Sequence, residues 1–111
     1  MSEIKTAFLF VKSEYKWVRI DLANVLFLSG LRDYTQVYIK GKTSPITTLQ
    51  NLKEFEAKLP TEAFIRIHKS FIVAIAQIDS IGKNEICIGE NTLPIGNAYK
   101  QALNLVIEKH S

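Results

Sequence analysis

Short apolar runs separated by turn-forming residues recur along almost the whole chain, and they restrict the folds available to it. The runs that we expect to form strands are 7–11, 15–20, 24–28, 34–40, 43–47, 64–67, 78–82, 85–89 and 92–96. The polar tripeptide Lys12-Ser13-Glu14 predicts a β-hairpin between the first two runs, and Pro45 favours a sheet edge. Segment 72–77 is consistent with a short helix or a strand. The pattern therefore predicts a mainly β protein.

Two segments have helical periodicity instead. Segment 47–59 carries one apolar stripe and ends at Pro60, which cannot continue a helix. Thr47 and Gln50 have the spacing of a capping box, in which two side chains satisfy free backbone amides of the first turn. Asn97 is expected to cap a second helix. The two apolar faces consist of Leu49, Leu52, Phe55 and Leu59, and of Tyr99, Ala102, Leu103 and Val106. The predicted class is α+β, mainly β with two short amphipathic helices.

Size and composition indicate one soluble domain. The chain has 111 residues, of which 47% are hydrophobic and 23% are charged, an ordinary globular balance. No apolar run approaches the roughly 20 residues that span a membrane, and the start of the chain does not resemble a signal peptide. The single cysteine, Cys87, excludes an internal disulfide. A net charge of +3 is only mildly basic. We therefore expect a cytoplasmic domain without membrane contact.

The polar triplet His68-Lys69-Ser70 is the first place to look for catalysis, because it contains a base and a hydroxyl. No carboxylate stands beside His68 in the sequence, and no glycine-rich elbow presents Ser70, so a catalytic triad has little support. The other histidine, His110, is at the C-terminus, and no spacing matches a zinc site or a phosphate-binding loop. We therefore expect no enzymatic activity, no metal and no cofactor.

Most of the aromatic residues lie in apolar runs, where burial is the usual outcome. Those expected in the core are Phe8, Phe10, Trp17, Phe27, Phe55, Phe64 and Phe71. Three tyrosines, Tyr34, Tyr38 and Tyr99, border polar loops and are candidates for ligand contact. A single-strand binder would need more exposed aromatics among basic residues, so that function is only weakly supported.

Four short motifs follow one another in a characteristic order. The pattern F-x-R-x-H-[RK]-S-[FY]-[IV]-V is matched by Phe64, Arg66, His68, Lys69, Ser70, Phe71, Ile72 and Val73. The strand-to-helix turn LPVSR-x-Y is matched by Leu93, Pro94, Ile95 and Tyr99. Upstream matches are Val25, Phe27, Leu28, Gly30, Asp33 and Tyr34, followed by Thr48, Leu49 and Leu52. Together these motifs resemble the LytTR-type DNA-binding domain of bacterial response regulators, over a core of about residues 7–107.

The resemblance implies elongated antiparallel β-sheets and sequence-specific binding of double-stranded DNA, read in the major groove through loops. The positions that it places at the DNA are Tyr34, Thr35, Lys69, Ser70, Gly96, Asn97 and Lys100. Arg66 and His68 share one face of a strand, and we expect them to support the site structurally. Direct-repeat sites are also implied.

Residues 1–111 would form one such domain, a fragment or the output domain of a larger two-component transcriptional regulator. An upstream receiver or sensor domain is not present in this sequence, and dimerisation would depend mainly on that missing part.

One departure from the family pattern lies at Gly96-Asn97, where many members have Ser-Arg. Asn97 either reads adenine, with which an amide bonds bidentately, or only caps the following helix. The alternative function is a small β protein–protein interaction module without nucleic-acid binding. Convergence of the predicted DNA-facing residues on one positive face would favour DNA over that alternative.

Overall fold

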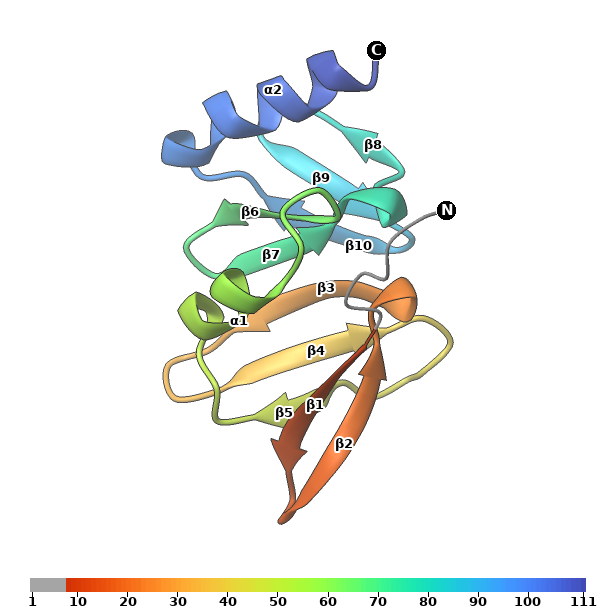
Figure 1. The fold of residues 1–111 in the computed structure, drawn as a ribbon. Helices are drawn as coiled ribbons and strands as arrows, with labels where there is room; N and C mark the ends of the chain where they lie inside the picture. The colour runs from red at the N-terminus through yellow and green to blue at the C-terminus, as the bar shows by residue number, and fades with distance from the viewer. Residues whose placement is uncertain (1–7) are drawn as a thin grey trace, which may run out of the picture.

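The computed structural model describes residues 8–111, which form three stacked antiparallel sheets and two helices (Figure 1). The strands are β1 (Phe8–Ser13), β2 (Lys16–Asp21), β3 (Val25–Gly30), β4 (Thr35–Ile39), β5 (Ile46–Thr48), β6 (Phe64–His68), β7 (Phe71–Ala74), β8 (Ser80–Ile81), β9 (Glu85–Ile88) and β10 (Asn91–Pro94). The helices are α1 (Leu52–Lys58) and α2 (Lys100–Lys109), and three short 3-10 turns cover Leu22–Asn24, Ile75–Gln77 and Asn97–Tyr99. This architecture confirms the predicted class.

The middle layer is a five-stranded sheet in the order β5-β4-β3-β7-β6. Neighbouring residues of its central strands point into opposite cores, as the two-residue period of a strand requires. Leu28 of β3 and Ile72 of β7 pack with α1 and the β1–β2 hairpin, whereas Phe27 and Val73 pack with the sheet β10-β9-β8 and α2. Burial on both faces explains why these strands are apolar without interruption.

The β1–β2 hairpin occurs as predicted, but its turn is shorter than expected. Glu14 (φ 51°) and Tyr15 (φ 68°) both adopt the left-handed conformation, as in the two-residue turns that match the twist of a hairpin. Lys12 and Ser13 therefore belong to β1. The predicted strand began at residue 7, which lies outside the described residues.

Helix α1 begins later than predicted, and its cap is a different pair of residues. The Asn51 side chain accepts a hydrogen bond from the Glu54 N–H (2.9 Å), and the Glu54 carboxylate accepts one from the Asn51 N–H (2.8 Å). The expected Thr47–Gln50 box is wrong because β5 continues through Thr48, which pairs with β4. Leu49 consequently lies outside the apolar stripe and is 82% exposed.

In the second half of the chain, the structure resolves one open expectation and corrects another. Segment 72–77 divides into the end of β7 and a 3-10 turn. Asn97 makes no capping hydrogen bond, because a 3-10 turn intervenes and α2 begins with Tyr99 as its N-cap residue. On α2, Leu103 is buried and Val106 half-buried, whereas Ala102 is exposed.

Candidate nucleic-acid interface

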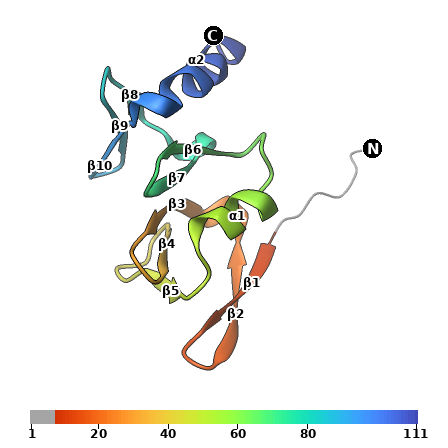
Figure 2. The same ribbon diagram turned by 90° about the vertical axis from the view of Figure 1, so that its left-hand side faces the viewer.

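Three connections gather on one side of the molecule, the left-hand side in Figure 1, which faces the viewer in Figure 2. They are the β3–β4 loop, the β6–β7 turn and the turn from β10 to α2. Backbone hydrogen bonds join them: the Gly30 N–H donates to the Ser70 carbonyl (2.7 Å), and the Gly96 N–H donates to the Ile67 carbonyl (2.8 Å). The predicted site positions, far apart in sequence, therefore form a single row across the sheets.

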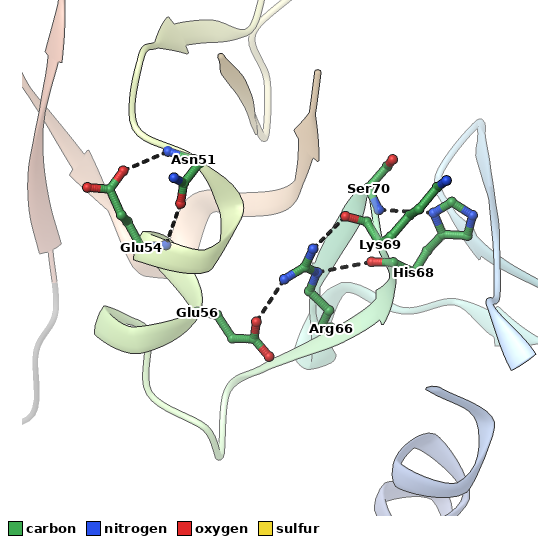
Figure 3. Close-up of polar contacts among 7 residues, drawn as sticks. All are labelled: Asn51, Glu54, Glu56, Arg66, His68, Lys69 and Ser70. Carbon is green, nitrogen blue, oxygen red and sulfur yellow. Dashed lines mark hydrogen bonds and ion pairs between the residues drawn. The ribbon is translucent and has the colours of Figure 1, made fainter. Parts of the chain in front are cut away.

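The β6–β7 turn is held by two side chains of β6 (Figure 3). Arg66 donates from Nε to the His68 carbonyl (3.1 Å), from Nη2 to the Lys69 carbonyl, and from Nη1 to the Glu56 carboxylate (2.8 Å). The His68 Nδ1 accepts from the Ser70 N–H (3.0 Å). The strand register also shifts between Arg66 and His68. These contacts fix the backbone that carries Lys69.

Lys69 itself is exposed and lines a groove between the β6–β7 turn, the β3–β4 loop and the first turn of α1. Two further exposed cations, Arg32 and Lys53, line the same groove. Glu56 on α1 is already paired with Arg66. The groove is therefore rich in positive charge. Lys53 was not among the predicted site residues, because its place in this groove depends on the packing of α1 beside the β6–β7 turn.

Tyr34 and Thr35, predicted together as one DNA-facing position, have opposite environments. The Tyr34 side chain is 37% exposed, whereas Thr35 is completely buried. The Thr35 hydroxyl donates to the Gln50 carbonyl (2.7 Å). This hydrogen bond offsets the free-energy cost of burying a polar group. Thr35 therefore anchors the start of β4, and its side chain has no surface for a ligand, which corrects that part of the prediction.

The turn before α2 is held through its backbone, and the Asn97 side chain takes no part in capping. Asn97 is exposed, and neither 3-10 turn nor helix uses its side chain as a cap. Gly96 lies close to its neighbours: a Cβ at this position would be 3.0 Å from the Tyr99 ring and 3.6 Å from the His68 ring. Lys100 donates from Nζ to the Asn84 side-chain oxygen (2.8 Å). Glycine thus permits the close contact, and the amide of Asn97 remains available.

The described residues offer little support for a metal site or a membrane-spanning helix. Residues 8–111 contain no group of three or more His, Cys, Asp or Glu side chains that would suit a metal ion. No helix in the same range has both the length and the apolar character required to cross a membrane. At His68, the Nδ1 atom accepts from the turn backbone, and the ring contacts Phe71.

Comparison with known proteins gives one family and a similar solved structure. The family model of the LytTr DNA-binding domain matches residues 15–108. A solved structure of the LytTr DNA-binding domain from a protein of Bacillus cereus, described as a methyl-accepting/DNA response regulator, has the same fold with a TM-score of 0.79. The two are 23% identical, and the match covers 93% of this chain and 98% of the other. The chain belongs to the LytTr family of DNA-binding domains.

Proposed function

We propose that this chain is the non-enzymatic output domain of a transcriptional regulator and binds specific sequences of double-stranded DNA. The observation that carries the proposal is the convergence of three connections and their cations on one side. Scattered positions would have favoured the protein–protein interaction module instead. Donor-rich side chains on short turns, supported by rigid strands, suit phosphates and base edges.

The dimensions of the protein support reading through loops in two successive segments of the major groove. The domain measures 41 × 40 × 25 Å along its principal axes. The longest of these dimensions exceeds the roughly 34 Å helical repeat of DNA. The connections at the two ends of the row contain Tyr34 and Asn97, and Lys69 lies between them. We assign these three side chains to the base edges.

The remaining cations and the hydroxyl suit the phosphates, which provide most of the affinity without reading sequence. We assign Lys100 and Ser70 to this role, as the family resemblance implies, and add Arg32 and Lys53 because they line the groove beside Lys69. Gly96 contributes by allowing close backbone approach. Each of these groups lies on the same side as the base-reading residues.

The wider setting of the domain is part of the same proposal. Residues 1–111 act as one domain in the cytoplasm, with no membrane contact of their own. A receiver or sensor domain elsewhere in the regulator supplies the signal, and that part contributes to dimerisation on direct-repeat sites.

Selection of binding sites from random duplexes, followed by salt titration of the selected duplex, tests this function. Neutralisation of about four to six phosphates predicts a slope of roughly −4 to −5 for log affinity against log salt. A shuffled duplex of the same composition is the control for specificity. Absence of binding at low salt, or affinity independent of salt, would contradict the proposal.

A further inference from the structure

The β1–β2 hairpin presents an aromatic face to solvent, although its aromatic residues were expected in the core. Phe8, Phe10 and Trp17 are 39%, 55% and 63% exposed. The opposite face of the hairpin, with Val11 and Ile20, is the one that packs into the core. The outer face therefore has apolar surface that no described part of the chain covers.

This outer face has a regular pattern of rings and charges. The strand register places Phe8 opposite Asp21, Phe10 opposite Arg19, and Lys12 opposite Trp17, so each row contains one ring and one charged side chain. The Arg19 guanidinium lies 4.2 Å from the centre of the Phe8 ring, and the Lys12 ammonium lies 5.2 Å from that of Trp17. Such cation–ring contacts show that rings and cations on this face are compatible neighbours.

We propose that the outer face of the hairpin binds the same face of a second copy of this chain. A two-fold axis parallel to the strands would exchange β1 and β2 across the interface. In the two rows nearest the turn, this places Phe10 against Arg19 of the other copy and Lys12 against Trp17 of the other copy. The rings then meet cations and not each other, and like charges are kept apart. The pattern in these two rows is thus complementary to itself, as a two-fold interface requires.

The area available predicts a weak dimer. At the exposures given above, the three aromatic side chains offer roughly 350 Å² of surface per copy. With the stems of Lys12 and Arg19, two copies would bury about 1,000 Å², which is at the lower limit for a specific interface. We therefore expect a dissociation constant on the order of 100 μM, which becomes important at high local concentration.

The hairpin face contains none of the residues that we assign to DNA. The dimer is therefore independent of the proposed DNA binding, and the failure of one leaves the other intact. A two-fold pair presents its two DNA-binding sides in inverted orientation, so it would join inverted sites or two separate DNA segments. Direct-repeat binding would not use it.

Sedimentation velocity of the DNA-free chain from about 10 μM to about 1 mM tests the proposal. We expect reversible dimers whose dissociation constant rises at least tenfold in Phe10→Glu and in Arg19→Glu. The control on another exposed apolar side chain is Leu105→Glu (62% exposed), which should dimerise normally. Melting curves check that each variant is folded, and DNA binding of each should be unchanged. A monomer throughout, a dimer unaffected by Phe10→Glu and Arg19→Glu, or an equal loss of the dimer in Leu105→Glu would overturn the proposal.

Crosslinking tests the direction of the axis. Phe10→Cys and Arg19→Cys are made separately with Cys87→Ser, which removes the single native cysteine. A short bismaleimide can bridge packed sheets, which lie about 10 Å apart. A mixture of the two variants should yield mainly the mixed product, identified by mass. A preference for products between identical variants would contradict the pairing of rings with cations.

Discussion

The β6–β7 turn and the turn before α2 lie side by side on the proposed DNA-binding side, yet they are held in different ways. In the first turn, Arg66 donates to two backbone carbonyls, and the His68 Nδ1 accepts from the Ser70 N–H. The second is joined to its surroundings by the Gly96 backbone, while Asn97 makes no capping bond. The first turn therefore has little freedom to change without loss of structure. In the second, the Asn97 side chain can be replaced at little cost in stability.

The largest expected effect concerns the residue that fixes the first turn. Arg66→Ala removes hydrogen bonds to two backbone carbonyls and the ion pair with Glu56. The Arg66 side chain is only 18% exposed. We expect a loss of about 2–3 kcal/mol in the free energy of unfolding, measured with urea, together with weaker DNA binding. Glu56→Gln keeps an acceptor for Arg66 and should cost less than about 1 kcal/mol. Equal effects of the two substitutions would contradict the role given to Arg66.

At the second turn, Asn97→Arg should change specificity and leave stability almost unaltered. A long guanidinium can bond to guanine O6 and N7, so selected sites should shift toward guanine at one position by about 1–3 kcal/mol. The free energy of unfolding should change by less than about 0.5 kcal/mol, because Asn97 has no capping bond to lose. Identical selected sites for the parent and the variant would show that this turn does not read bases.

Substitution of Lys69 tests whether the β6–β7 turn positions a side chain that contacts DNA. Lys69→Ala should weaken duplex binding about tenfold at low salt and make the salt slope less steep by about 1 if the ammonium also neutralises a phosphate. The melting temperature should change little because this side chain is exposed. Lys40→Ala is the matched control, since Lys40 is exposed just beyond the other end of β4 from the Tyr34 loop. An equal loss of affinity in both variants would indicate a general charge effect.

The smallest expected effect is a difference in the free energy of unfolding between alanine variants of two asparagines near helix starts. Asn51→Ala should lower the free energy of unfolding by about 1 kcal/mol, because Asn51 forms half of a capping box. Asn97→Ala should change it by less than about 0.5 kcal/mol. Thermal or urea unfolding of both variants measures the difference. A larger cost at Asn97 would restore the capping role that the sequence suggested.

Much of the fold could be predicted because strand runs and turn residues alternate so regularly. Prediction fails where two different structures are compatible with the same sequence pattern. In β1, phenylalanines alternate with Leu9 and Val11, so both faces of the strand are apolar, and the pattern does not tell which one faces the core. The start of α1 was predicted wrongly for a similar reason, because Thr47–Gln50 and Asn51–Glu54 both have capping-box spacing.

The candidate site was predicted mainly from the family resemblance, and the structure refines it through burial. Thr35 and Tyr34 are adjacent in sequence, but the pairing of β4 with β5 turns the threonine into the core. Lys53 joins the site only through the packing of α1 beside the β6–β7 turn. Tertiary contacts of this kind are not encoded in the local pattern.

The central claim is that three connections on one side form the DNA-binding surface, and an NMR titration with the selected duplex tests it most directly. The backbone amides of residues 31–34, 69–70 and 96–100 should show the largest shift changes. The Trp17 indole on the outer face of the hairpin should change little at protein concentrations below the dimer range. Changes concentrated on the β1–β2 hairpin, with the three connections unaffected, would contradict the claim.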